Sequence, residues 1–141
     1  MKIRFRLRMI LYAVALGLFL SGVAWELFDH FITVTSAIGP AKHPAEAWLL
    51  RAHGAAALVA VFVCGHLYSS HIRIAWRSGR KRGSGLALCA AILALVGSGY
   101  LLYYVGGDEL RDWVAGTHWW IGAAAPLPFL FHRFRKSAPV V

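Results

Sequence analysis

Four long uncharged segments, separated by short polar segments, dominate the chain. They are Met9–Trp25, Ala52–Ser70, Gly83–Gly107 and Trp113–Phe131, each 17 to 25 residues long. An α-helix of about 20 residues crosses the hydrocarbon core of a bilayer. When each segment is extended to its polar neighbours, the pattern predicts four membrane-spanning helices, over about residues 8–31, 45–76, 84–105 and 110–134.

The polar segments between these helices are short, which makes successive helices antiparallel neighbours. The first, "TVTSAIGPAKHPAEAW", contains Gly-Pro and His-Pro steps that favour turns. The other two are "RSGRKRGSG" and "GGDELRD". We therefore expect an all-α fold, an integral membrane four-helix bundle that forms a single membrane domain over residues 1–141. Its second and fourth helices run parallel.

Charged residues fall unequally on the two sides of this arrangement. Twelve of the fifteen lysines and arginines lie before the first uncharged segment, between the second and third, or after the fourth. The other side holds Lys42, Arg51 and Arg111 together with all six acidic residues. Because basic residues are enriched on the cytoplasmic side of membrane proteins, the pattern predicts that both termini are cytoplasmic.

The start of the chain also resembles a cleavable signal peptide, with basic residues, an apolar run and the small residues Gly22 and Ala24. We interpret it as an uncleaved span, because the charge pattern fits best with four helices.

Composition supports a membrane protein, since 59% of the residues are hydrophobic and four spans leave no room for a separate soluble domain. The net charge of +9 follows the membrane topology, which favours contact with anionic lipid and argues against nucleic acid as a partner. Cys64 and Cys89 both lie inside predicted spans, and no CxxC or CxxCH motif occurs. Disulfides, a zinc site and covalently attached haem are therefore unsupported.

Seven histidines are the candidate functional residues, because ionisable side chains inside a membrane are costly and usually functional. His30 and His43 belong to the first polar loop or its edge. The other five lie in predicted spans, at His53, His66 and His71 in the second and at His118 and His132 in the fourth.

Helical geometry selects four of these five. On a straight helix, the step from His118 to His132 is about 40° short of four turns, and the step from His53 to His71 is about five turns. Each pair therefore shares a helix face, with its members about 20 Å or more apart. His66 lies about 140° away from His53 and is the alternative to His71.

Two parallel helices that each present an outer and an inner imidazole suit two haem b groups with bis-histidine ligation. We therefore predict His53, His71, His118 and His132 as haem axial ligands that bind the haem iron. Candidate contacts for the haem propionates are the four arginines near the same levels, Arg51, Arg73, Arg111 and Arg133. Topology and snorkelling explain these arginines equally well.

Other residues bear on the same site. Pro126 and Pro128 lie between the two histidines of the fourth span, where they bend the helix and can re-aim His132. Gly54 and Gly122 would allow close approach of a flat macrocycle, although ordinary helix packing is the simpler explanation.

Other functions for the histidines are less favoured. A single histidine in a span more often forms a hydrogen bond between helices. Zinc or copper needs ligands within a few ångströms of each other, and a proton relay would need carboxylates, which here all lie on the outer side of the membrane.

The stretches "RAHGAAA", "HIRIAW", "GSGYLLYYVGGDELRDWVAGTHWW" and "PLPFLFH" resemble small bacterial four-helix di-haem b-type cytochromes. These are related to the cytochrome b subunits of Ni,Fe-hydrogenase and membrane formate dehydrogenase. The resemblance covers most of the chain from Trp25 to His132 and implies haem ligands at the same four histidines, without His66. In the larger relatives one haem takes a ligand from the first helix. Here the first span has no histidine in its cytoplasmic half, so the inner haem would use the second span.

The expected function is electron transfer across a bacterial inner membrane, between a periplasmic redox partner and quinone or another acceptor. We expect an electron-transfer subunit of an oxidoreductase complex rather than a stand-alone enzyme, because no nucleophile–base pair, phosphate loop or metal-hydrolase motif occurs. A haem-free subunit that anchors a larger membrane complex is the alternative. A transporter or channel is disfavoured by the lack of buried acidic residues.

Overall fold

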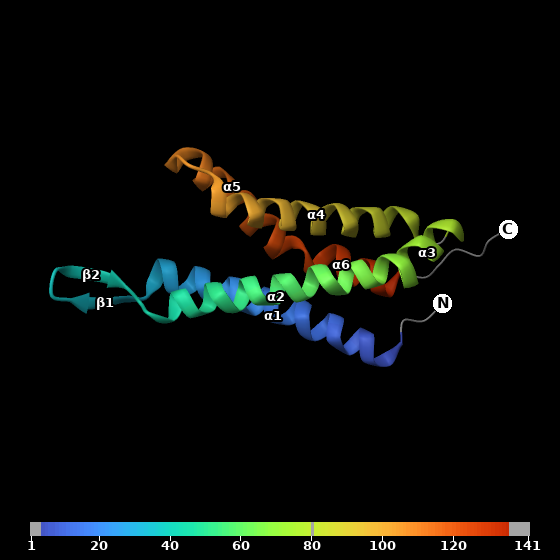
Figure 1. Cartoon of the computed structure of the whole chain (residues 1–141), viewed down its shortest axis with the longest axis horizontal. Helices are drawn as coiled ribbons and strands as arrows, with labels where there is room; N and C mark the ends of the chain where they lie inside the picture. Colours follow the sequence, from blue (N-terminus) through green and yellow to red (C-terminus); the bar gives the residue numbers. More distant parts are fainter. Residues whose placement is uncertain (1–3, 80, 136–141) are drawn as a thin grey trace. The chain divides into compact units, whose positions relative to one another are not determined.

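A computed structural model of the chain describes residues 4–79 and 81–135 and is mostly helical (Figure 1). In chain order its elements are α1 (Phe5–Phe31), β1 (Thr33–Ser36), β2 (Gly39–Lys42), α2 (Ala45–Leu67), the π-helical turn η1 (Tyr68–Ile72), α3 (Arg73–Arg77), α4 (Arg82–Tyr104), α5 (Asp108–Ala124) and α6 (Pro126–Phe134). Three of the basic residues used for the topology prediction, Lys2, Arg80 and Lys136, lie outside the described residues.

Within the described residues, three helices are long and apolar enough to cross a membrane. They are Phe5–Phe31, Ala45–Arg77 and Arg82–Tyr104, which match the first three predicted spans closely. The second of these runs through α2, η1 and α3 as one helical segment. A π-helical turn holds more residues per turn than an α-helix and is frequent at functional sites.

The fourth predicted span is divided into two shorter helices, α5 with 17 residues and α6 with 9. Ala125, between them, keeps α-helical angles with φ −54° and ψ −32°. Pro126 follows as the first residue of α6, where its missing N–H removes a helical hydrogen bond. The helical segment between His118 and His132 is therefore interrupted at Pro126, and the bend that would re-aim His132 stays a prediction.

The first polar loop differs from the prediction, because part of it forms a β-hairpin. Strands β1 and β2 pair antiparallel, with Thr33 opposite Lys42 and Ser36 opposite Gly39. Gly39 has a φ of +119°, which glycine adopts without strain, and its carbonyl oxygen accepts a hydrogen bond of 2.6 Å from the Ser36 hydroxyl. The β-branched run from Thr33 to Thr35 favours a strand here.

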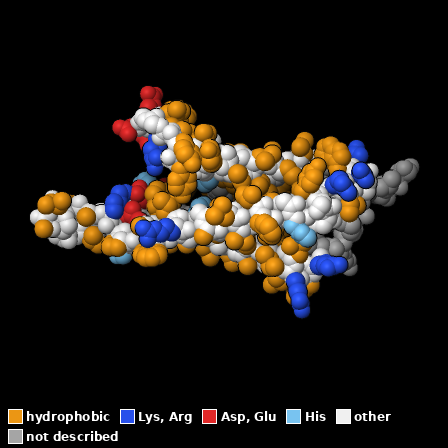
Figure 2. Space-filling view, viewed as in Figure 1, with side chains coloured by type: hydrophobic (Ala, Val, Ile, Leu, Met, Phe, Trp, Pro, Cys, Tyr) orange, Lys and Arg blue, Asp and Glu red, His pale blue; other side chains and the backbone are white. Residues whose placement is uncertain are grey.

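The chain divides into two compact units between Cys64 and Gly65, and each unit is described by itself. The first unit contains α1, the hairpin and most of α2. In the second unit, α4 contacts both α5 and α6, which together run back along it (Figure 1). Acidic side chains gather over the turn between α4 and α5, and basic side chains gather at the opposite end of α4 (Figure 2).

Large apolar side chains cover the outside of the helices rather than filling a core. Phe62 is 82% exposed and Leu58 is 75% exposed, whereas Val63 and Leu67 are the buried apolar side chains among the described residues. A soluble protein rarely exposes apolar surface on this scale. The exposure is the arrangement that helices in contact with lipid tails require.

Candidate functional site

His53 on α2 lies against the neighbouring helix α1. Its ring nitrogen Nδ1 is 2.9 Å from the hydroxyl oxygen of Ser21. A Cβ atom added to the next residue, Gly22, would lie 3.3 Å from His53 Cε1, which is tighter than an ordinary contact. The imidazole therefore rests directly on a Ser-Gly step of α1.

His118 on α5 has the same surroundings in the second unit. Its Nδ1 is 2.9 Å from the Ser98 hydroxyl oxygen on α4. A Cβ atom at Gly99 would again lie 3.3 Å from the ring carbon Cε1.

His132 on α6 repeats this arrangement at the other end of α4. Its Nδ1 is 3.0 Å from the hydroxyl oxygen of Ser84, and a Cβ atom at Gly85 would lie 3.6 Å from its Cε1. The backbone carbonyl oxygen of His132 accepts a 2.9 Å hydrogen bond from Lys81 Nζ. These contacts hold both the ring and the backbone of His132 against the start of α4.

Sequence analysis did not find these Ser-Gly steps, although the sequence holds a signal for them. Ser84 and Ser98 are 14 residues apart on α4, as His118 and His132 are on the antiparallel α5 and α6. Equal spacings on antiparallel helices allow both serine–histidine pairs to form at once, about 21 Å apart. The sequence offered Gly122 as a place where a macrocycle could approach the helix. A Cβ atom added there would lie 3.7 Å from Leu95 Cδ2, which is an ordinary packing distance.

The structure brings two of the four predicted ligands together. The imidazole centres of His71 and His132 are 6.4 Å apart, and the ring planes are nearly perpendicular at 87°. A nitrogen–metal bond is about 2 Å and a ring nitrogen lies about 1 Å from its ring centre, so two imidazoles on opposite sides of one metal ion have centres roughly 6 Å apart. The separation of His71 and His132 matches this requirement.

His71 differs from the other three histidines in its hydrogen bonding. It lies in η1, and its Nδ1 atom is buried with no hydrogen-bond partner among the described residues. A buried polar atom in this state calls for an explanation, such as a functional role.

The alternative ligand, His66, lies in the last turn of α2 with an exposed side chain. Its carbonyl oxygen accepts hydrogen bonds from the Ser69 and Ser70 hydroxyls, at 3.1 and 2.8 Å. His53 and His118, predicted to share the outer haem, belong to different units, so their pairing stays a prediction.

The four arginines proposed as propionate contacts are all exposed. The guanidinium of Arg51 lies 4.8 Å from the Trp48 ring centre, and that of Arg133 lies 5.7 Å from the Phe134 ring centre. Arg111 donates a 2.8 Å hydrogen bond to the Leu102 carbonyl oxygen. These contacts fit side chains that snorkel at a membrane surface, and the propionate role of the four arginines, including Arg73, stays a prediction.

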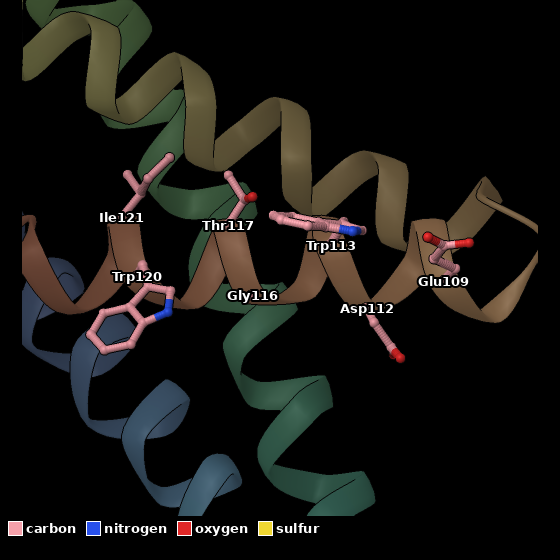
Figure 3. A pocket seen from close by; sticks show the side chains of 7 residues that line it. All are labelled: Glu109, Asp112, Trp113, Gly116, Thr117, Trp120 and Ile121. Atoms are coloured by element: carbon pink, nitrogen blue, oxygen red, sulfur yellow. The ribbon is translucent and has the colours of Figure 1, made fainter.

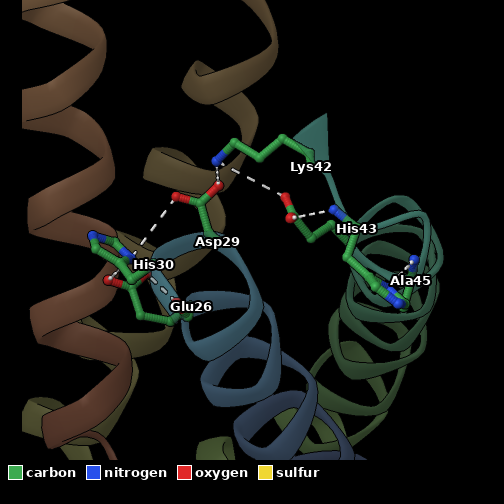
Figure 4. A network of polar contacts seen from close by, with 7 residues as sticks. Glu26, Asp29, His30, Lys42, His43 and Ala45 are labelled. Carbon is green, nitrogen blue, oxygen red and sulfur yellow. Dashed lines mark hydrogen bonds and ion pairs between the residues drawn. The ribbon is translucent and has the colours of Figure 1, made fainter. Parts of the chain in front are cut away.

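A polar network joins the end of α1 to the hairpin and the start of α2 (Figure 4). Lys42 donates a hydrogen bond to Asp29 and lies 4.0 Å from Glu46. Its hydrogen bond to the Asp29 carboxylate raises the pKa of Lys42 above its ordinary value. Glu46 accepts a 3.1 Å hydrogen bond from the His43 backbone N–H, so it caps α2 from within its first turn. This network stabilises the connection rather than building a second metal site.

A shallow hollow follows one helix, α5 (Figure 3). It is lined by Glu109, Asp112, Trp113, Gly116, Thr117, Trp120 and Ile121. Trp113 and Trp120 are about 70% exposed here. No predicted haem ligand lines this hollow, so its chemistry is separate from that of the histidines.

Within residues 4–79 and 81–135, no three side chains of histidine, cysteine, aspartate or glutamate are placed to hold a metal ion together. Haem iron needs only its axial ligands from the protein, and two imidazoles can supply them. No protein-family model, curated protein or solved structure matches this chain.

Proposed function

We propose that this protein is a four-span, di-haem b-type cytochrome of a bacterial inner membrane, with both termini in the cytoplasm. The proposal joins the resemblance to the small bacterial di-haem cytochromes with the geometry of the histidines. His53 and His118 would hold the outer haem, and His71 and His132 the inner one.

The observation that carries the proposal is the ring contact between the imidazoles of His71 and His132. Their ring centres are 6.4 Å apart, so these two imidazoles would be able to bind one iron atom between them. The two rings meet edge to face, and His71 Nδ1 has no hydrogen-bond partner among the described residues.

The chain's own residues would bind and orient the cofactors. Three of the imidazoles lie against a neighbouring helix of their own unit, and the exposed apolar side chains would face lipid. Haem iron, when bound, supplies one-electron redox chemistry. Two levels of histidines about 20 Å apart would then allow electrons to pass between a periplasmic redox partner and quinone or another acceptor on the cytoplasmic side.

Haem content is the first test. The full-length chain is expressed in a bacterial host, purified in detergent and analysed by reduced-minus-oxidised spectra and a pyridine haemochrome assay. We expect a b-type spectrum and about two haems per chain, because four imidazoles supply two bis-histidine sites. A folded, helical but colourless protein would exclude the proposal.

Single-histidine variants identify the ligands. His71→Ala and His132→Ala should each remove the same haem, and His53→Ala and His118→Ala should each remove the other. His66→Ala is the matched control, since His66 lies on the same helical segment with an exposed side chain. Full haem content in His71→Ala together with loss in His66→Ala would move the ligand to His66.

A haem-free subunit that anchors a larger membrane complex is the second candidate. The exposed Trp113 and Trp120 along the hollow of α5 favour it, because such a surface can receive a helix of another subunit. His118→Ala separates the two candidates: an anchor would assemble as before, whereas a cytochrome would lose one haem.

A further inference from the structure

We propose that Ser21, Ser98 and Ser84 are positioning residues that fix the tautomer of His53, His118 and His132 with the proton on Nδ1, so that Nε2 is the nitrogen through which each ring would bind iron. The inference rests on the proposed di-haem function. It adds the residues that set the chemistry of the ligands.

The direction of two of these hydrogen bonds follows from the serine backbone contacts. The Ser21 hydroxyl lies 2.7 Å from the Gly17 carbonyl oxygen, and the Ser98 hydroxyl lies 2.6 Å from the Ala94 carbonyl oxygen. A carbonyl oxygen only accepts, so each serine donates its single proton to the backbone of its own helix. Each serine oxygen is then an acceptor toward the imidazole.

The imidazole must therefore donate, which places the proton on Nδ1. A neutral imidazole carries one proton, so the Nε2 atoms of His53 and His118 keep a lone pair. Ser84 lies 3.3 Å from the Lys81 carbonyl oxygen and 3.0 Å from His132 Nδ1, and we assign His132 the same tautomer by analogy with the other two pairs. A metal-bound histidine commonly donates its other N–H to a protein acceptor, which fixes the ring and raises its basicity.

The adjacent glycines make these contacts possible. Gly22 and Gly99 have no side chain, so the rings of His53 and His118 approach the helix backbone closely enough for Nδ1 to reach the serine oxygen. The arrangement occurs once in the first unit and twice in the second, on two different partner helices. Three of the four predicted ligands have a serine–histidine contact of this kind. An isolated hydrogen bond between two helices would not be repeated in this way.

His71 provides an internal comparison, because its Nδ1 has no partner among the described residues. The inner site would therefore have one ligand held by a serine, and the outer site would have two. A ligand whose N–H is hydrogen-bonded is more basic and stabilises ferric over ferrous iron. We expect the outer site to have the lower reduction potential.

The test compares Ser21→Ala, Ser98→Ala and Ser84→Ala in the full-length protein. Redox titration of the purified variants should show one potential raised in each, by about 59 mV if the preference for ferric iron falls tenfold. Ser→Thr variants keep a hydroxyl that bonds the backbone in the same way and should restore the potential. Ser78→Ala is the control, because Ser78 donates to the Ala75 carbonyl oxygen at 3.0 Å and its hydroxyl contacts no imidazole in the described residues.

A second readout does not depend on haem. Nitrogen NMR of ¹⁵N-histidine in the haem-free full-length chain should find the Nδ1–H tautomer for His53, His118 and His132, with loss of this preference in the alanine variants. A wild-type protein that binds no haem but has these tautomers would overturn the proposed function alone. A haem-loaded wild type whose potentials and tautomers are the same in the alanine variants would overturn the positioning role alone. If an alanine variant loses haem entirely, the positioning role is tested by the histidine tautomers of that variant and by the reduction potential of the matching threonine variant.

Discussion

Gly22 and Gly99 determine how closely an imidazole approaches the neighbouring helix. A Cβ atom at either position would lie 3.3 Å from the ring of His53 or His118, so that ring would have to move by a few tenths of an ångström. Overpacking of this kind costs roughly 1–3 kcal/mol. Exchanging glycine for alanine in a helix gains only about 1 kcal/mol, so the steric effect should prevail.

We therefore expect Gly99→Ala to weaken the hydrogen bond between His118 and Ser98 and to lower haem content. Gly97→Ala is the control on the same helix, because a Cβ atom there meets no described atom within 4 Å. It should retain both haems and gain up to about 1 kcal/mol of stability. Haem per chain and thermal unfolding are the measurements, and equal haem loss in both variants would contradict the role of Gly99.

At the residue scale, the sequence predicted only part of the candidate site. The sequence pointed to the histidines themselves, since imidazoles in apolar helices stand out. It did not point to their serine partners, because serine and glycine are common in membrane helices and each Ser-Gly step lies far from its histidine along the chain. Only the pairing of helices brings Ser84 to His132, 48 residues later.

At the scale of elements, the junction of α5 and α6 separates His118 from His132. Pro126 begins α6 and cannot donate the hydrogen bond that would continue α5. His132 follows six residues later and contacts both Ser84 and His71. His118 lies before the junction. A change at Pro126 should therefore move His132 and leave His118 in place.

We predict that Pro126→Ala restores a backbone donor, joins α5 and α6 into a straighter helix and moves His132 away from Ser84. Haem content should fall from two per chain toward one, with the haem of His118 retained. Leu127→Ala is the control, because Leu127 is the next residue and is 70% exposed. Unchanged spectra and full haem content in Pro126→Ala would show that the proline does not aim His132.

The helices were predictable as elements because each apolar segment is long and bounded by charged residues. Their ends agree with the predicted spans to within a few residues, from Phe5 for α1 to Phe134 for α6. The hairpin and the π-helical turn were not predicted. Both are local changes in backbone hydrogen bonding that leave the overall apolar pattern of the sequence unaltered.

For the molecule as a whole, the number of membrane crossings decides where the C-terminus lies. Three helices meet the length and apolarity of a membrane span, while α5 and α6 together cover the fourth predicted one. Four crossings place both termini on one side, and three place them on opposite sides. The distribution of basic residues favours four.

We predict that a fluorescent protein fused after the last residue is fluorescent and that alkaline phosphatase fused there is inactive, since the former works in the cytoplasm and the latter outside it. Fusions placed after Gly106, in the turn before α5, should show the opposite result and serve as the control. An active phosphatase at the C-terminus would exclude the four-span topology and place α5 and α6 together on one side of the membrane.

The sequence by itself determined the helical segments, their apolar character and the few imidazoles within them, because hydrophobic length and charge act locally along the chain. The tertiary structure decided which side chains meet across helices. It brought His71 into ring contact with His132, and it placed each of three histidines on a Ser-Gly step of its neighbour. Such contacts depend on the register and the close approach of whole helices, which no single segment encodes.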